Sequence, residues 1–174
     1  MSEESNKMSL SEYEENILNN VDEHGFFVNS VFDPNGVDPD FSYSIGFPSS
    51  LNCPDFIIFG LPKDLMHNML WDVFHQIKEG KLPEDGTEWL KLLDGDYVCV
   101  SKRVHPSNHI REYLNSSMWY YKHLGRRIED FSAFQLVWPG TRVKKLPWED
   151  GCAVDVIEAQ TPLWLKRSEQ IEQP

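Results

Sequence analysis

The hydrophobic and polar positions along the chain follow helical spacing in some segments and strand spacing in others. Apolar residues recur every three or four positions over 10–23, between Pro62 and Gly80, and over 108–124, which predicts three amphipathic helices. Ser9 stands before the first of them at the spacing of a capping box. Two shorter helical segments are predicted as well, over 87–93 and near 153–160.

Alternating or continuous apolar runs predict five strands, over 26–32, 41–47, 55–61, 96–103 and 133–138. In the second strand the odd-numbered residues are apolar and the even-numbered ones small or polar, so we expect one apolar and one polar face. The third strand is apolar almost throughout, as expected for a strand covered on both faces. An Asn-Gly pair at 35–36 is a turn signal and predicts that the first two strands form a hairpin.

The order of these elements predicts the fold class. Helices and strands are mixed without regular alternation, which is typical of an α+β domain. We expect a mainly antiparallel sheet of about five strands, with about three main helices packed on one side of it. The predicted boundaries are a flexible acidic tail over 1–8, a single domain over 9–166 and a C-terminal tail over 167–174.

Composition adds an uneven charge to this picture. The chain has 174 residues, with 16 Lys and Arg against 28 Asp and Glu, for a net charge of −12. Residues 1–24 are strongly acidic, whereas residues 101–145 carry an excess of Lys and Arg. The overall sign argues against nucleic-acid binding and favours a basic protein partner.

Features of the sequence also indicate where the protein resides. No apolar stretch is long enough to span a membrane, and the acidic N-terminus lacks the apolar core of a signal peptide. The three cysteines, Cys53, Cys99 and Cys152, are odd in number and far apart, which suits reduced thiols better than a disulfide framework. We therefore expect a cytoplasmic protein, and nothing in the pattern predicts a cofactor.

Four short motifs carry a family resemblance. They are FSYSIGF at 41–47, CPDFIIFGLP at 53–62, FQLVWPG at 134–140 and LPWEDGCAVDVIEAQTPL at 146–163. In this order and spacing the chain resembles a bacterial family described as domain of unknown function 4262, over roughly residues 11–165. The resemblance supports the domain limits and implies no catalytic activity. The chain departs from the family pattern at Cys53, where relatives have His, at Gly140, where they have an acid, and at Thr161, which interrupts a Gln-Pro pair.

The most suggestive candidate site combines basic and aromatic residues. Trp119, Arg126 and Arg127 lie in or just after the third predicted helix, and Arg side chains beside aromatic rings suit planar anions. Tyr43, Gln135 and Trp138 are candidates for a polar pocket at the end of the sheet. The alternatives are an ordinary surface for the first three residues, and a structural link between the last strand and the C-terminal segment for the others.

Other candidates for chemistry are weaker. His105 and His109 have the four-residue spacing of metal ligands, but no acid completes a metal motif, so surface histidines are the alternative and no metal ligand is assigned. Asp55 opens a buried strand, where we favour backbone capping over acid–base catalysis. The chain has no nucleophile elbow and no phosphate-binding glycine loop.

Three functions follow from these observations, in order of preference. The first is a small acidic, non-catalytic domain that binds a partner protein, in the manner of an immunity or antitoxin factor. The second is binding or turnover of a small anionic planar ligand, nucleotide-like in chemistry, at the basic and aromatic residues. The third is a metal-dependent hydrolase that uses His105 and His109. Catalytic residues, the oligomeric state and the identity of the ligand or partner are not assigned by the sequence.

Overall fold

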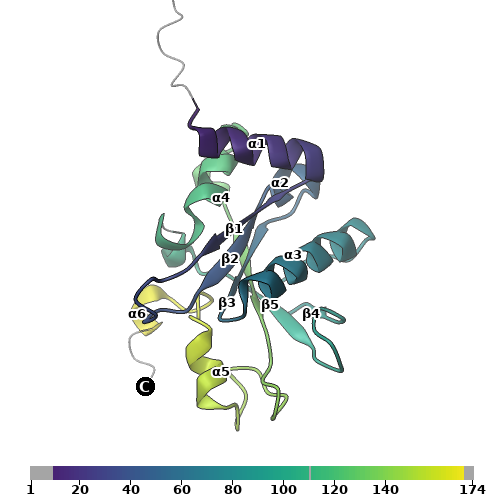
Figure 1. The fold of residues 1–174 in the computed structure, drawn as a ribbon, viewed down its shortest axis with the longest axis vertical. Coiled ribbons are helices and arrows are strands. Elements are labelled where there is room, and N and C mark those ends of the chain that lie inside the picture. The colour runs from purple at the N-terminus through teal and green to yellow at the C-terminus, as the bar shows by residue number, and fades with distance from the viewer. Residues whose placement is uncertain (1–9, 110, 171–174) are drawn as a thin grey trace, which may run out of the picture.

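The computed structural model describes residues 10–109 and 111–170, which form one α+β domain (Figure 1). The helices are α1 (Glu12–His24), α2 (Phe47–Ser50), α3 (Lys63–Lys78), α4 (Arg111–His123), α5 (Val154–Ala159) and α6 (Arg167–Gln170). The strands are β1 (Phe27–Val31), β2 (Phe41–Ile45), β3 (Asp55–Phe59), β4 (Glu88–Trp89), β5 (Cys99–Arg103) and β6 (Ala133–Val137). The predicted tail over 1–8 and the cap predicted at Ser9 lie outside the described residues.

The strands form one mixed sheet in the order β1-β2-β3-β6-β5-β4. All neighbouring pairs are antiparallel except β3 with β6, which run parallel at the centre of the sheet. The predicted hairpin is confirmed, because β1 and β2 pair from Phe27 opposite Ile45 to Val31 opposite Phe41. The prediction of a mainly antiparallel α+β sheet is confirmed as well.

The prediction of a helix over 87–93 is wrong. Glu88 and Trp89 instead form the short strand β4, which pairs with Cys99 and Val100 of β5 and makes the described sheet six-stranded. The Trp89 side chain is fully buried, and its indole Nε1 donates to Ser101 Oγ at 3.1 Å. Burial of this indole against β5 decides the conformation, because seven residues of helical spacing stabilise an isolated helix only weakly.

The helices cover both faces of the sheet, not one side as expected. On one face α3 packs through Met66, Met69 and Leu70 against Phe56 and Ile58 of β3. On the other face a second core cluster includes residues of α1, α4, β2 and β3, namely Ile17, Val21, Leu114, Tyr120, Tyr43, Ile45, Ile57 and Phe59. The central strands are therefore buried on both faces, as the apolar run of β3 predicted.

Burial on both faces also corrects the prediction for β2. Ser42 and Ser44 were expected on a polar face, yet both are fully buried. Phe47 was expected to continue the apolar face of Tyr43, but the strand ends at Ile45 and Gly46 adopts a φ of 122°. The chain therefore turns into α2, and Phe47 joins the core cluster under α3.

Helix α1 has its cap at Ser11 and not at Ser9, where the spacing predicted it. Ser11 Oγ accepts from Glu14 N at 3.1 Å, while Glu14 Oε1 accepts from Ser11 N at 3.0 Å. This reciprocal pair is a capping box. The helices predicted over 10–23, before Gly80 and over 108–124 are confirmed as α1, α3 and α4, and α5 confirms the helical turn near 153–160.

The close approach of β3 to α5 yields a test of the fold. Gly60 has a φ of +79°, and a Cβ at this position would lie 2.2 Å from the carbonyl oxygen of Ala159. We expect Gly60→Ala to lower the free energy of unfolding by about 3 kcal/mol, because left-handed backbone costs about 1–2 kcal/mol and the backbone clash adds to it. Urea denaturation measures this loss.

Gly36→Ala is the matched control. Gly36 has a φ of +66°, but apart from Gly36 itself and its two chain neighbours no described residue comes within 4 Å of the place that a Cβ would occupy, so only the backbone cost of about 1 kcal/mol applies. Equal losses for the two variants would show that the contact between Gly60 and Ala159 does not limit stability.

Candidate functional site

Tyr43, one of the predicted ligand-binding residues, lies inside the fold. Its side chain is 2% exposed, and its hydroxyl accepts hydrogen bonds from Asn29 Nδ2 at 2.9 Å and from Ser116 N at 3.1 Å. These bonds join β1, β2 and α4. The Tyr43 hydroxyl therefore makes its hydrogen bonds within the protein, as buried polar groups generally do.

Gln135 and Trp138 connect the last strand to the C-terminal segment. Gln135 donates to Thr161 O at 2.8 Å and accepts from Leu163 N at 2.9 Å. The backbone of Trp138 donates to Gln160 Oε1 at 3.0 Å, and its indole donates to Phe59 O of β3 at 2.7 Å. Both side chains are buried. This geometry matches the structural alternative that the sequence left open for these residues, and ligand binding by them stays a prediction.

Trp119, Arg126 and Arg127 lie on the surface of α4 and the turn after it. Trp119 stacks on His123 with ring centroids 5.2 Å apart, and Arg127 pairs with Glu129 at 3.6 Å in an exposed contact. Arg126 donates to Pro48 O at 3.2 Å and lines a small cleft of about 150 Å³. These three residues therefore have separate neighbours, and ligand binding by them stays a prediction.

Asp55 is the most unusual titratable group in the described chain. Its carboxylate is fully buried and accepts from Ser44 Oγ at 2.8 Å, from Phe47 N at 3.0 Å and from Ser117 Oγ at 2.6 Å. Burial raises its pKa to about 6, against the lowering effect of these hydrogen bonds. The contact with Phe47 N is the backbone capping that the sequence favoured.

Cys53 and Cys99 are poor nucleophiles, because the pKa of each thiol is raised. Burial and the nearby Asp55 carboxylate raise the pKa of Cys53 to about 12, and burial raises the pKa of Cys99 to about 12. The thiolate is the reactive form of cysteine, so these side chains are almost entirely unreactive thiols near neutral pH. Cys99 lies in the core of the sheet, as its place in an alternating strand predicted.

The histidines do not form a metal site within the described residues. His105 Nδ1 accepts from Ser107 N at 3.2 Å. Burial lowers the pKa of His109, whose Nε2 is buried and has no hydrogen-bond partner in the part of the chain that the structure describes. In residues 10–109 and 111–170, no three His, Cys, Asp or Glu side chains are placed to hold one metal ion. The metal-dependent hydrolase accordingly has no support from the geometry.

A feature that the sequence did not reveal is a recess of about 350 Å³ beside the β1–β2 loop. We call it the acidic–aromatic recess. Its floor consists of Phe41, Phe59 and Tyr113, whose ring centroids lie 5.0 to 5.9 Å apart. Its remaining walls are largely apolar and acidic, lined by Val31, Phe32, Asp33, Pro34, Asp38, Pro39, Glu112 and Thr161.

Hydrogen bonds hold the loop beside this recess in one conformation. The Asp33 carboxylate accepts from the backbone N–H groups of Asn35, Val37 and Asp38, each at 3.0 Å. These bonds, led by that from Asp38, lower the pKa of Asp33 and keep the carboxylate charged. Glu112, a third acid of the recess, makes an exposed ion pair with Arg167 at 3.4 Å.

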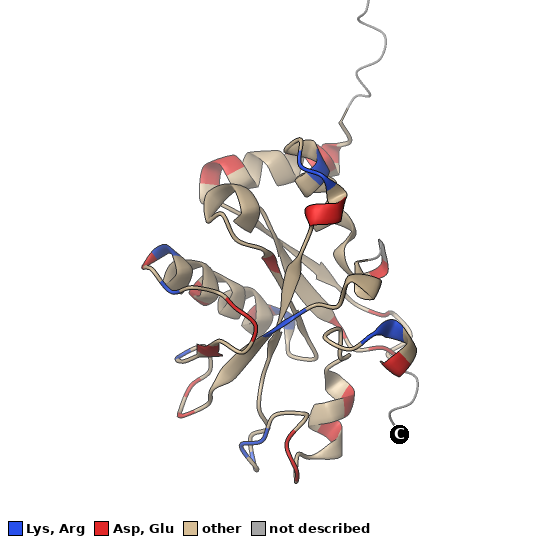
Figure 2. Cartoon of the chain, turned by 180° about the vertical axis from the view of Figure 1, so that it is seen from behind, with Lys and Arg blue, Asp and Glu red and all other residues tan. Residues whose placement is uncertain are grey.

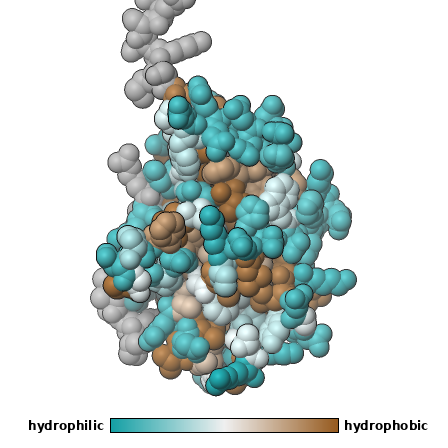
Figure 3. Space-filling model, viewed as in Figure 1, coloured by the Kyte–Doolittle hydropathy of each residue, from teal (hydrophilic) through white to brown (hydrophobic). Residues whose placement is uncertain are grey.

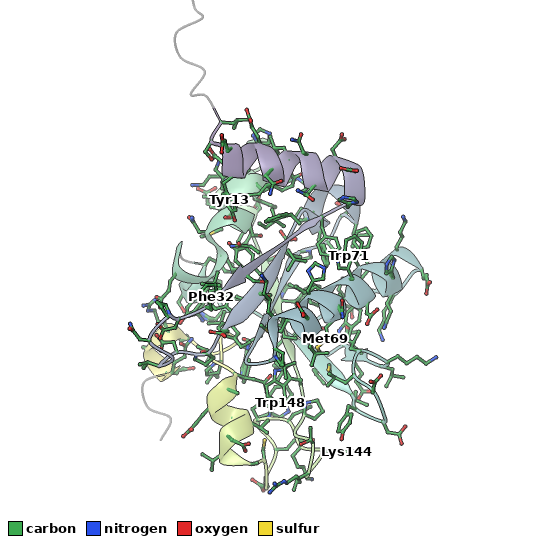
Figure 4. The ribbon with its side chains drawn as sticks, viewed as in Figure 1. Tyr13, Phe32, Met69, Trp71, Lys144 and Trp148 are labelled. Atoms are coloured by element: carbon green, nitrogen blue, oxygen red, sulfur yellow. The ribbon has the colours of Figure 1, made fainter. Side chains whose placement is uncertain are left out.

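The other side of the same loop is also acidic. A shallow recess of about 550 Å³ is lined there by Asp38, Asp40, Asp155 and Glu158 together with Val37 and Leu61. Beside these recesses stand Phe32, 69% exposed, and Val37, 81% exposed. Figure 4 shows Phe32 at the far end of β1 from Trp71, and Figure 2 shows acidic residues on α5 and the neighbouring loops.

One signal for this surface was present in the sequence. The segment from Phe32 to Asp40 places three aspartates around a turn, next to an aromatic residue and a valine. The aromatic floor gave no such signal, because Phe41, Phe59 and Tyr113 are distant in the chain and meet only through strand register and the packing of α4.

Comparison with known proteins assigns the chain to a family. The model of the family described as Domain of unknown function (DUF4262) matches residues 20–153, so the chain belongs to this family, as its motifs predicted. Neither the curated proteins nor the solved structures include a significant match. Among the described residues, no helix combines the length and the apolarity needed to cross a membrane.

The Asp55 carboxylate predicts how stability varies with pH. Its pKa of about 6 lies above the ordinary value of 3.8, so this group favours the folded state below pH 3.8 and loses that effect as pH rises through 6. We expect this one residue to lower the free energy of unfolding by about 2 kcal/mol between about pH 4.5 and pH 7.5.

Asp55→Asn provides the comparison for this measurement. The amide is isosteric and keeps an acceptor for Phe47 N but does not titrate, so urea unfolding of this variant should lack the additional loss with pH. Parallel pH profiles for the two proteins would contradict a raised pKa at Asp55.

Proposed function

We propose that this protein is a non-catalytic interaction domain that binds a basic segment of a partner protein at the β1–β2 loop. The observation that carries the proposal is the exposure of Phe32 and Val37 beside two recesses lined by carboxylates. Exposed apolar residues surrounded by charge are typical of protein interaction sites. In Figure 3 apolar surface is interrupted by hydrophilic residues, including those around this loop.

The chemistry of the acidic–aromatic recess suits a cationic side chain. Asp33 and Asp38 have no salt bridge to Lys or Arg within the described residues. The Asp33 carboxylate is held by three backbone N–H groups, so Asp38 is the acid that we expect to pair with a ligand cation. The Tyr113 ring offers a face that attracts cations, and the apolar walls fit the aliphatic stem of Lys or Arg. Burial raises the pKa of Tyr113, which keeps its hydroxyl protonated.

The net charge supports the same partner class. A charge of −12 attracts a basic protein over long range and speeds its association at low ionic strength. The same charge opposes nucleic acid. An immunity-like or antitoxin-like role, in which the domain blocks a basic protein, is one form of this function.

Binding or turnover of a planar anion at Trp119, Arg126 and Arg127 is the alternative function. The geometry supports it less, because Trp119 stacks on His123 and Arg127 pairs with Glu129. Arg126 lines a cleft, but that cleft of about 150 Å³ is small for a nucleotide-like ligand.

We also propose that the protein resides in the cytoplasm, since an odd number of free thiols suits a reducing compartment.

Differential capture tests the proposed partner site. The immobilised protein is exposed to lysate of the organism that encodes it at physiological salt, and bound proteins are quantified by mass spectrometry. We expect a basic protein that is retained by the unchanged chain and reduced at least about tenfold by Asp38→Lys or Phe32→Ser, since central interface residues dominate affinity.

Glu79→Lys is the control for Asp38→Lys. It makes the same change of charge at an exposed position at the end of α3, away from both recesses. A partner lost equally from the two lysine variants would indicate general electrostatic attraction, and a partner unaffected by either loop variant would place the interface elsewhere.

A further inference from the structure

One edge of the sheet is open to a further strand. Strand β1 stands at the end of the strand order, and within the described residues no backbone–backbone hydrogen bond joins it to any segment other than β2. Its residues are half-buried or exposed, whereas every residue of β2 is buried. Figure 1 shows β1 on the near side of the sheet, with no helix drawn across it. The outer edge of β1 therefore faces solvent.

The register of the sheet identifies the backbone groups on this edge. Gly60 N donates to Asp40 O at 2.8 Å, in line with the register of β2 and β3, so the even-numbered residues of β2 bond toward β3. The odd-numbered residues of β2 and their odd-numbered partners in β1 then bond to each other. By alternation, Val28 and Ser30 direct their N–H and C=O groups away from the sheet.

This edge lacks the features that protect sheet edges from pairing. Residues 26–32 include no charged residue, no proline and no glycine. The other edge of the described sheet is β4, which is only two residues long and includes Glu88. Short length, charge and proline are the usual means of preventing strand pairing. Their absence from β1 indicates that this edge is available to a strand from another chain.

The end of β1 leads into the acidic–aromatic recess. Val31 and Phe32 line that recess together with Asp33 and Asp38. A residue placed opposite Val31 on an added strand would share its face of the sheet, since directly opposed residues point to the same side. The long side chain of a Lys or Arg at that position can extend past Val31 toward the Asp38 carboxylate.

We propose that the basic partner segment binds as an extended strand along β1, with a Lys or Arg opposite Val31 in the acidic–aromatic recess. This inference rests on the proposed function and adds the conformation and the position of the partner segment. Backbone hydrogen bonds to Val28 and Ser30 supply affinity, and the cation in the recess supplies specificity, which is the general division in strand addition.

A second copy of the chain is a less suitable occupant of this edge. In an antiparallel pairing of two β1 strands, Asp33 of each copy would approach Asp22 and Glu23 near the end of α1 in the other. Each copy also carries a net charge of −12, so electrostatic repulsion opposes the pair. An extended basic segment has the complementary charge.

A peptide library supplies the probe for the test. Random twelve-residue peptides displayed on phage are selected on the immobilised full chain at physiological salt, and the most enriched peptide is synthesised for fluorescence polarisation. We expect it to combine Lys or Arg with a run of β-branched or aromatic residues. N-methylation of one alternating set of its backbone amides should weaken binding at least about tenfold more than methylation of the other set, because only one edge of the bound strand pairs with β1.

Ser30→Pro tests the edge from the side of the protein, and Ser30→Ala is its matched control. Both variants lose the hydroxyl that lies 2.8 Å from Ser42 Oγ, but only proline also removes the outward N–H group. Proline is tolerated on an edge strand where its nitrogen faces solvent. We expect Ser30→Pro to bind the selected peptide at least about tenfold more weakly than Ser30→Ala, and thermal unfolding of each free variant shows whether it is folded.

The outcomes separate this inference from the function on which it rests. Equal effects of the two N-methylated sets, or equal affinities of folded Ser30→Pro and Ser30→Ala, would overturn strand addition while a loss of binding in Asp38→Lys would keep the proposed function. Failure to enrich any basic peptide, or binding unaffected by Asp38→Lys, would contradict both. Self-association of the free chain that Ser30→Pro abolishes, measured by analytical ultracentrifugation, would identify a second copy as the occupant and overturn the inference.

Discussion

The arrangement of this domain depends on one buried carboxylate. Asp55 opens β3 and bonds at once to Ser44 of β2, to the backbone at Phe47 where α2 begins, and to Ser117 of α4. Burial of a charge is costly, and three neutral donors offset only part of that cost. The group nevertheless fixes where β2 ends and how α4 lies on the sheet, and α4 in turn supplies Tyr113 to the acidic–aromatic recess.

The elements with strong local patterns were predictable, and those decided by distant partners were not. Helix α3 has apolar residues at helical spacing from Pro62 to Gly80, and this local pattern is enough to predict it. Strand β4 is two residues long and exists because Trp89 is buried against β5, which no local pattern reveals. The prediction that all helices lie on one side of the sheet failed for a related reason. Ser42 and Ser44 had the pattern of a solvent-facing side, yet hydrogen bonds to Ser30 and Asp55 make their burial possible.

The candidate sites show the same division. Capping by Asp55 was predictable from its place at the start of a buried strand, whereas the roles of Gln135 and Trp138 as links to the C-terminal segment were open until their partners were known. The acidic–aromatic recess is assembled from segments far apart in the chain. Charge alone is a weak guide to it, and the decisive feature is an aromatic floor that packing brings beside the acidic residues.

The parallel pairing of β3 with β6 has a consequence for biosynthesis. These two strands are neighbours at the centre of the sheet, but α3, β4, β5 and α4 all lie between them in the sequence. During translation the first three strands and α1 emerge well before β6, so the β3 edge stays unpaired until most of the chain has left the ribosome. Such an edge attracts other strands, and a stalled or shortened chain of this protein is therefore prone to aggregate.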